Sequence, residues 1–237
     1  MKIIAQPESY SDMLERIFAT TLVTGIMCTL ILAGSSPAVK ALLDSVKTEA
    51  EIGPVKNLKA LYVLLPIAIA VISRALRLHD RISDILRIRF DFDTQYILFP
   101  MAHLTGHELD RNMRGLIRSA RQEAMYKVFY PYAGFADPKI DKQLVRSALD
   151  NWGWFWVCIE SGFLFSVTAV IVKVLHRDTQ FRICLVILLV IAIMLLVQWF
   201  ACRRSAGRQV RAIVDDEGRK SDIRAYFAGM MASPNKW

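Results

Sequence analysis

The most unusual ionisable residue in the sequence is a glutamate inside an apolar segment. Glu160 is the one acidic residue well inside the hydrophobic stretch that begins near Trp152. Ionisation of a carboxyl group in such surroundings costs at least about 2–3 kcal/mol, so its side chain must face protein or water. Its neighbours include Ser161, Gly162, Ser166 and Thr168. Two interpretations stay open: a proton-linked or pore-lining group, or a hydrogen-bonded carboxyl group that fixes helix packing.

A second polar cluster lies in the first apolar segment of the chain. Its small and hydroxyl-bearing residues are Thr20, Thr21, Thr24, Gly25, Cys28 and Thr29. Thr21, Gly25 and Thr29 recur every four residues, which places them on one face of a helix. Such a face lets two helices approach closely, so it favours a tight helix interface, with a water-lined path as the alternative. The predicted pore-lining or intramembrane polar residues are Glu160, Ser161, Thr24 and Thr168.

Histidine and cysteine spacing does not predict a metal site. His103 and His107 stand four residues apart with Glu108 beside them, but a capping box at Thr105 starts a helix between them, so the two histidines do not share a helical face. The cysteines lie in or at the edges of apolar segments, without the paired spacing of zinc or redox sites. They are Cys28, Cys158, Cys184 and Cys202. We therefore predict no metal and no cofactor.

Motifs for catalysis are missing from the sequence. It contains no glycine-rich phosphate loop, no nucleophile elbow and no paired-carboxylate motif. Asp91 and Asp93 alternate with Arg87 and Arg89, but such alternation is typical of a solvated helix face or of salt bridges between subunits. We therefore expect that the protein is not an enzyme.

Four apolar blocks must position the polar residues described above. The chain has 237 residues, of which 54% are hydrophobic, and this excess is concentrated in residues 17–38, 58–76, 152–175 and 183–201. A helix needs about 20 apolar residues to cross a hydrocarbon core of roughly 30 Å. The sequence therefore predicts an all-α integral membrane protein with four transmembrane helices.

The distribution of lysine and arginine predicts the orientation of these helices. Residues 77–151 and the tail, residues 202–237, are rich in both. The loops at residues 39–57 and 176–182 carry few basic residues or balance them with acidic ones. Because basic segments resist translocation, the central segment, the tail and the N-terminal residues 1–16 are predicted to be cytoplasmic, and the two loops external.

Extensions of the membrane helices are expected to form a cytoplasmic helical bundle. No proline or glycine occurs between Pro66 and Pro100, so the second span is predicted to continue as one long helix. A further helix starts at the capping box, another runs from near Pro138 into the third span, and the fourth span continues toward Val214. The apolar stripe on the extended second helix is the predicted oligomer or partner contact. It consists of Leu78, Ile82, Ile85, Phe92 and Tyr96.

The net charge of +8 is explained by a membrane surface without a nucleic acid. Basic residues next to a span attract the anionic lipids of the inner leaflet. We predict contacts with lipid headgroups for three arginines that directly follow the fourth span. These are Arg203, Arg204 and Arg208. Nucleic-acid binding is not expected.

Residues 85–100 resemble a stretch found in a class of bacterial defence proteins. The four-span pore-forming effectors associated with cyclic-oligonucleotide defence systems carry a Phe-Asp…Leu-Pro stretch soon after the second span. The comparable residues here are Phe92, Asp93, Leu98, Phe99 and Pro100. A Trp-Asn pair that follows this proline in those proteins is replaced by Met101 and Ala102. The chain is also similar in size and span count to the membrane subunit of the two-component Kiwa phage-defence system.

Both resemblances imply a homo-oligomer in the bacterial inner membrane that works with a cytosolic partner. Together with Glu160, they favour an oligomeric pore or channel-like effector in antiviral defence, controlled through its cytoplasmic helices, with a tetramer as the expected assembly. The alternative is a non-conducting membrane sensor or scaffold that recruits a cytosolic defence protein.

Overall fold

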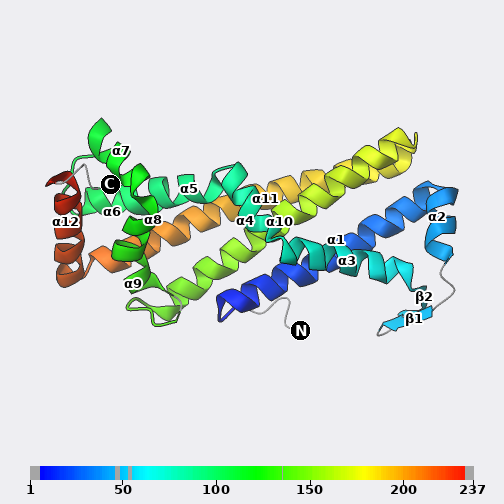
Figure 1. The fold of residues 1–237 in the computed structure, drawn as a ribbon, viewed down its shortest axis with the longest axis horizontal. Helices are drawn as coiled ribbons and strands as arrows, with labels where there is room; N and C mark the ends of the chain where they lie inside the picture. Colours follow the sequence, from blue (N-terminus) through cyan, green and yellow to red (C-terminus); the bar gives the residue numbers. More distant parts are fainter. Residues whose placement is uncertain (1–5, 46–48, 53–54, 135, 233–237) are drawn as a thin grey trace. The chain divides into compact units, whose positions relative to one another are not determined.

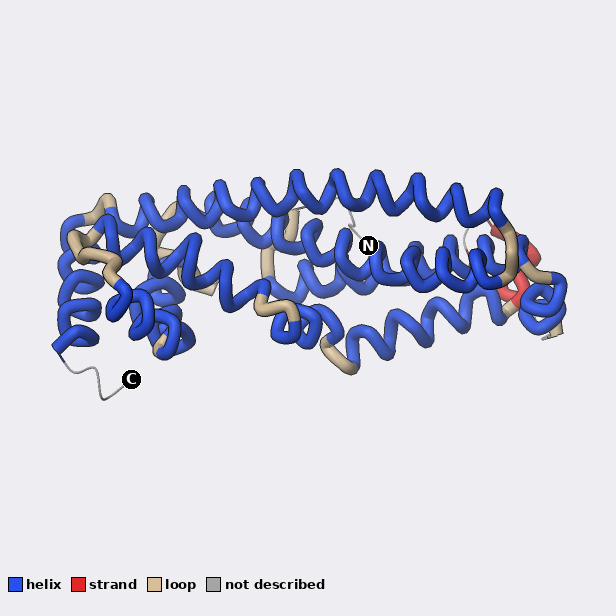
Figure 2. Tube along the Cα trace, turned by 90° about the horizontal axis from the view of Figure 1, so that it is seen from above, coloured by secondary structure: helices blue, strands red, loops and turns tan. Residues whose placement is uncertain are grey.

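The computed structural model describes residues 6–45, 49–52, 55–134 and 136–232, and almost all of this chain is helical (Figures 1 and 2). One antiparallel hairpin pairs β1 (Glu49–Ile52) with β2 (Val55–Lys59). The region predicted as the first external loop also contains α2 (Pro37–Asp44), whose first turn is capped by the Ser36 hydroxyl. The prediction of a helical fold is confirmed, with this hairpin as an addition.

The chain divides into two compact units. Unit 1 contains residues 11–79 and 153–198, and unit 2 contains residues 6–10, 80–152 and 199–232. Helices α10 (Lys142–Val174) and α11 (Asp178–Val214) contribute residues to both units.

Three helices have the length and composition of membrane spans: α10, α11 and α1 (Tyr10–Ser35). The second predicted span corresponds to α3 (Leu61–Ala75), which has 15 residues. At 1.5 Å per residue it extends about 22 Å, less than a hydrocarbon core of roughly 30 Å. It reaches spanning length only if α3 and α4 (Leu78–Ile85) are counted as one bent span.

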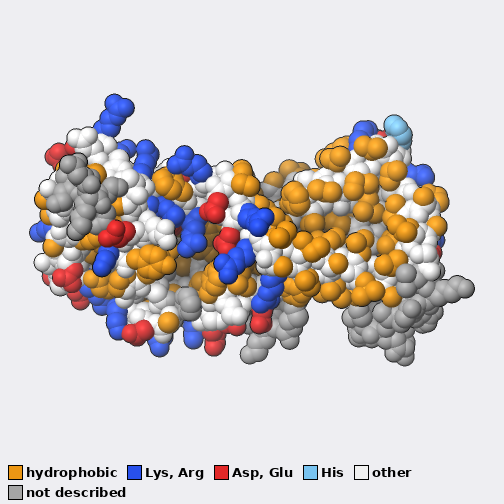
Figure 3. Space-filling view, in the orientation of Figure 1, with side chains coloured by type: hydrophobic (Ala, Val, Ile, Leu, Met, Phe, Trp, Pro, Cys, Tyr) orange, Lys and Arg blue, Asp and Glu red, His pale blue; other side chains and the backbone are white. Residues whose placement is uncertain are grey.

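Unit 1 presents an apolar surface. Figure 3 shows hydrophobic side chains covering the visible face of this unit. Only 6% of the most apolar stretch of α11 is buried, and Val186 and Leu189 are each 62% exposed. A helix that is apolar on all sides is suited to hydrocarbon or to contacts with other apolar helices.

Helices α1 and α3 approach each other closely at a glycine. A Cβ atom added to Gly25 would lie 3.1 Å from the Cβ atom of Pro66, a proline inside α3. This is the close approach that the small-residue face of the first span predicts. The Thr29 hydroxyl on the same face donates to the carbonyl oxygen of Gly25 within α1.

The prediction of one long helix after the second span is wrong. Helix α3 ends at Ala75, and Arg77 adopts a left-handed backbone conformation with φ of 46°. After α4, Arg87 has φ of 54°, and α5 (Ile88–Phe92) begins. A residue other than glycine in this region costs about 1–2 kcal/mol, so tertiary packing must impose both breaks.

Unit 2 consists mainly of short helical segments. They are η1 (Asp93–Leu98), α6 (Phe99–Leu104), α7 (Arg111–Ser119), α8 (Arg121–Ala124), η2 (Met125–Phe129), α9 (Tyr130–Ala133) and α12 (Glu217–Ala232). Segments η1 and η2 are π-helices. Their apolar residues form the core with those of α7 and α12. Its buried members include Met113, Ile117, Ala124, Val128, Ile223, Phe227 and Met230.

The predicted capping box is not formed. The Thr105 hydroxyl donates instead to the carbonyl oxygens of Met101 and Ala102, at 2.9 and 3.0 Å, at the end of α6. Helix α7 is capped by Asp110, whose carboxylate accepts a hydrogen bond from the Met113 amide at 2.7 Å. The Thr105 hydroxyl bonds to the end of the preceding helix and does not cap the next one, which begins later than predicted, at Arg111.

The longer helices in the second half of the chain follow their predicted courses. Helix α10 continues through the three tryptophans near its start into the apolar segment, although it begins at Lys142 and not near Pro138. Helix α11 extends to Val214, as predicted.

The contact between α1 and α3 generates the first prediction. Gly25→Leu places a side chain against Pro66, and overpacking of this kind costs about 1–3 kcal/mol. We expect its melting temperature in detergent to fall by at least about 3 °C. Gly34→Leu is the matched control, because a Cβ atom there meets nothing within 4 Å in the same helix. Equal melting temperatures for the two variants would contradict close packing at Gly25.

Candidate functional site

Glu160 joins three helices through hydrogen bonds. Its side chain is 3% exposed, and its Oε2 atom accepts hydrogen bonds from the Thr21 hydroxyl at 2.6 Å and the Ser73 hydroxyl at 3.3 Å. Thr21 belongs to α1, Ser73 to α3 and Glu160 to α10. An acidic side chain in an apolar unit therefore has polar partners supplied by the same chain.

The neighbouring turn adds a second polar contact between α1 and α10. The hydroxyl oxygens of Thr24 and Ser161 lie 3.0 Å apart, and either can donate. Thr168 is buried, but its hydroxyl donates to the carbonyl oxygen of Leu164 within α10. The structure therefore brings Glu160 and Ser161 of α10 against Thr21 and Thr24 of α1, while the Thr168 hydroxyl donates within α10. The pore-lining role of these residues stays a prediction.

A buried histidine lies near this cluster. His79 is 8% exposed, and its ring centroid lies 6.1 Å from that of Trp156 in an edge-on arrangement. It also interacts electrostatically with the Glu160 carboxyl group. The helix break at Arg77 precedes it by two residues, and no local sequence signal marks that break.

The buried cluster combines one carboxyl group with hydroxyl groups of three helices. Hydroxyl groups both donate and accept hydrogen bonds, so they can serve the carboxyl group as partners. Ionisable groups with polar partners inside an apolar unit are typical of ion and proton pathways. Among the described residues, no group of three or more His, Cys, Asp or Glu side chains could hold a metal ion.

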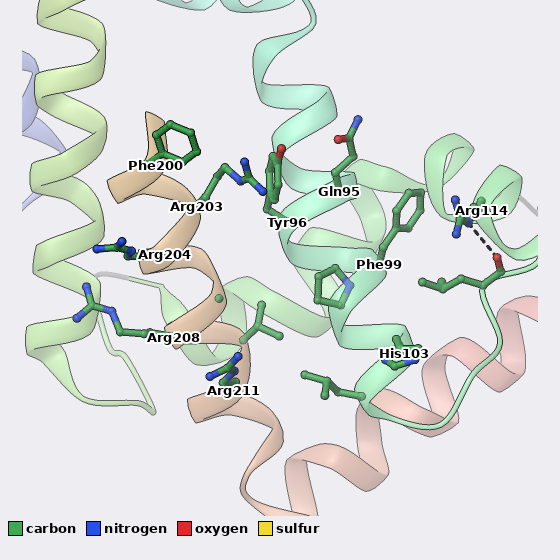
Figure 4. Close-up of a pocket in the computed structure, with 15 residues that line it drawn as sticks. Gln95, Tyr96, Phe99, His103, Arg114, Phe200, Arg203, Arg204, Arg208 and Arg211 are labelled. Atoms are coloured by element: carbon green, nitrogen blue, oxygen red, sulfur yellow. Dashed lines mark hydrogen bonds between the residues drawn. The ribbon is translucent and has the colours of Figure 1, made fainter. Parts of the chain in front are cut away.

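A second candidate site lies in unit 2. It is a cavity of about 870 Å³ between α11, α6 and the segments next to α6 (Figure 4). Five arginines line it: Arg114, Arg203, Arg204, Arg208 and Arg211. Arg203 lies over the rings of Tyr96 and Phe200, with its guanidinium carbon 4.5 and 5.7 Å from the ring centroids. All three arginines predicted to contact lipid headgroups therefore line one cavity.

Comparison with protein families places the chain in one of them. A family model described as the YmfE protein family matches residues 9–229. The chain belongs to this family. The YmfE match includes the Glu160 cluster and every residue that lines the arginine-rich cavity. No curated protein and no solved structure matches the chain.

The Phe-Asp pair of this YmfE family member is part of the packing of unit 2. Asp93 begins η1, is 6% exposed and accepts a hydrogen bond from the Arg121 guanidinium at 2.5 Å. Burial raises the pKa of Asp93 above its usual value, although the charges of Arg121 and Arg89 oppose that shift. The ion pair joins η1 to α8, which gives it a structural role.

The predicted contact stripe is not one continuous surface in this family member. Phe92 is 2% exposed and packs against Tyr96, Trp152 and Trp199, with ring centroids 5.3, 4.6 and 5.7 Å away. Leu78, Ile82 and Tyr96 are half-buried, and Ile85 is 79% exposed. The helix breaks separate these residues. A contact between subunits at Ile85 stays a prediction, whereas Phe92 belongs to the core of unit 2.

Removal of one hydroxyl group tests the Glu160 cluster. Thr21→Val deletes the shorter of the two hydrogen bonds to a buried carboxyl group, which costs about 1–3 kcal/mol. We expect a lower melting temperature in detergent. Thr20→Val is the matched control, because the Thr20 hydroxyl donates only to carbonyl oxygens of its own helix. An equal fall in melting temperature for both variants would mean that the hydrogen bond to Glu160 does not contribute more to stability than a bond within one helix.

Proposed function

We propose that this protein is an oligomeric channel-like effector of the bacterial inner membrane that acts in phage defence and is controlled through its cytoplasmic helices. The Glu160 cluster carries the conducting part of this proposal. A carboxyl group that is buried among apolar helices and bonded to Thr21 and Ser73 is costly to maintain. A role in moving ions or protons gives a reason for that cost.

Four spans with both termini in the cytoplasm fit this role. Helices α1, α10 and α11 supply three spans, and α3 with α4 supplies the fourth as a bent pair. The basic residues of unit 2 support a cytoplasmic location for that unit, because positively charged segments resist translocation. The short connection between α10 and α11 and the segment between α1 and α3 are then external.

The end of α3 offers a way to open the cluster. Ser73, a donor to Glu160, lies four residues before Arg77, whose backbone is left-handed. A strained residue of this kind costs about 1–3 kcal/mol and is held in place by its surroundings. A movement of α3 about Arg77 would withdraw the Ser73 hydroxyl and expose the carboxyl group. The cytoplasmic helices that follow Arg77 would drive this movement.

Conduction requires several copies of the chain. Within one subunit α1 and α3 pack closely at Gly25 and Pro66. A path between subunits avoids this close packing, and a tetramer is the assembly that we propose. The exposed apolar residues of α11 can contact either lipid or a neighbouring copy.

The defence role rests on the resemblance of residues 85–100 to four-span defence effectors. The size and predicted span layout of the chain are similar to those proteins and to the Kiwa membrane subunit. Neither resemblance supplies a catalytic residue, which fits a protein that acts on the membrane barrier.

A non-conducting sensor or scaffold is the second candidate. Ile85 and Leu86 are 79% and 61% exposed at the break between α4 and α5. Adjacent exposed apolar side chains in an otherwise charged unit are typical of a protein contact. This pair would recruit a cytosolic defence protein.

Membrane potential in infected cells distinguishes the two candidates. Cells that express the protein are challenged with phage and followed with a potential-sensitive dye. We expect rapid depolarisation with the wild type and its loss with Glu160→Leu, while Glu160→Gln, which keeps the shape of the side chain, gives an intermediate result. Glu123→Gln, at an exposed position of α8, is the control. An unchanged potential in wild-type cells, together with a cytosolic protein that co-purifies in stoichiometric amount, would favour the scaffold.

The orientation is tested separately with reporter fusions. A reporter that is active only in the cytoplasm should work when inserted within residues 137–141 or attached after Trp237. It should fail after Thr48, because that position lies in the predicted external loop. Activity at Thr48, or silence at residues 137–141, would reverse the orientation and remove the cytoplasmic control from the proposal.

A further inference from the structure

We propose that the arginine-rich cavity of unit 2 binds the phosphate group of an anionic ligand. The cavity has a volume of about 870 Å³, and its fifteen lining residues include five arginines and no aspartate or glutamate. Ligand binding at this cavity can be tested apart from conduction, because the cavity lies in unit 2 and shares no residue with the Glu160 cluster.

The positive charge of the cavity has no ion-pair partner among the described residues. Within the part of the chain that the structure describes, none of the ion pairs involves one of these five arginines. Asp93, the most buried acidic residue of unit 2 among those described, pairs with Arg121 outside the cavity. Like charges that gather without a counter-charge repel each other, so the cavity is stabilised by an anion that enters it.

Three of the arginines form a row on one helix. Arg204, Arg208 and Arg211 follow each other at spacings of four and three residues, which places their Cβ atoms about 5–6 Å apart along one face of α11. In the view of Figure 4, Arg204 and Arg208 point to the same side of the helix. Guanidinium groups at this spacing can hold one phosphate group between them, because each presents paired N–H donors to its oxygens.

The other side of the cavity is apolar and aromatic. Tyr96, Phe99 and Phe200 contribute rings, and Arg203 and Arg114 each lie over one of these rings at 4.5 and 5.7 Å. The Arg114 side chain is further fixed by a hydrogen bond to the Leu109 carbonyl oxygen at 2.9 Å. A ligand that combines a phosphate group with an apolar portion would satisfy both sides.

A glycine leaves the floor of the cavity open. Gly207 lines it between Arg204 and Arg208, and a Cβ atom added there would meet nothing within 4 Å. A larger side chain at this position would therefore extend into the cavity, starting from a Cβ atom that has open space around it. This position allows the cavity to be filled while every arginine is kept.

Two sources could supply the phosphate group: the headgroup of an anionic phospholipid or a soluble phosphate ester. Phe200, in the last turn of the apolar segment of α11, lines the cavity, which puts a lipid headgroup within reach along that helix. The chemistry at the arginines is the same in both cases. The experiment therefore uses one probe for each source.

Full-length protein is purified in an uncharged detergent and tested with two probes. Binding of phosphatidylglycerol is measured by native mass spectrometry after extraction from nanodiscs that also contain phosphatidylcholine. Binding of glycerol 3-phosphate is measured by equilibrium dialysis. We expect the triple change Arg204→Gln, Arg208→Gln and Arg211→Gln to weaken binding of at least one probe about tenfold or more, because charge-assisted hydrogen bonds are lost. Gly207→Leu should give the same loss.

Matched controls distinguish binding at the cavity from a general effect of removing positive charge. The triple change Arg81→Gln, Arg111→Gln and Lys142→Gln removes three exposed positive charges outside the cavity, and Gly229→Leu adds a side chain at another open glycine. Both should bind the probes like the wild type. A loss confined to phosphatidylglycerol identifies a lipid site, and a loss confined to glycerol 3-phosphate identifies a soluble ligand. If the cavity variants bind both probes as well as their controls do, the proposal is overturned, whatever the outcome of the potential measurements.

Discussion

The requirement that a carboxyl group find polar partners inside an apolar unit determines the arrangement of unit 1. Water is absent from hydrocarbon, so the hydrogen bonds of Glu160 must come from the chain. Two helices supply them, through Thr21 of α1 and Ser73 of α3. The small residues around these contacts follow from the same requirement, because short hydroxyl side chains reach the carboxylate only where helices lie close together. Gly25 against Pro66 provides that proximity one turn farther along α1.

Much of this arrangement could be predicted from the sequence, because apolar periodicity and composition are strong signals over long segments. The courses of α10 and α11 are of this kind. Ser73 could not be foreseen as a partner, because a single serine in an apolar helix has no pattern that distinguishes it. The positions of the long apolar helices can therefore be predicted from local composition. The hydrogen-bond partners of their polar side chains depend on the tertiary fold and cannot.

The segments that follow α3 were harder to predict, because their helices end where packing requires it. Arg77 and Arg87 break the chain without a glycine or proline nearby, and an arginine in the left-handed region carries no sequence signal. After these breaks, His79 is buried and Phe92 lies in the core of unit 2. A hydroxyl group between two helices can bond to the end of the first or cap the start of the second, and the Thr105 hydroxyl donates to the end of the first. In the cavity of unit 2, four of the five arginines lie close together on α11, but Arg114 joins them only through the tertiary fold.

The exposed apolar surface of α11 has a consequence for the biosynthesis of the protein. Only 6% of its most apolar stretch is buried, compared with 56% for α10 and 39% for α1. The apolar stretch of α11 therefore depends little on the other described helices of the same chain and is suited to entering the membrane as an independent segment. Helices α1 and α10 each carry polar side chains that are satisfied only in the presence of the other. The first helix to be synthesised must then wait for the third before its threonines find their partner, so early intermediates in membrane insertion hold unsatisfied polar groups that a chaperone of the membrane could recognise.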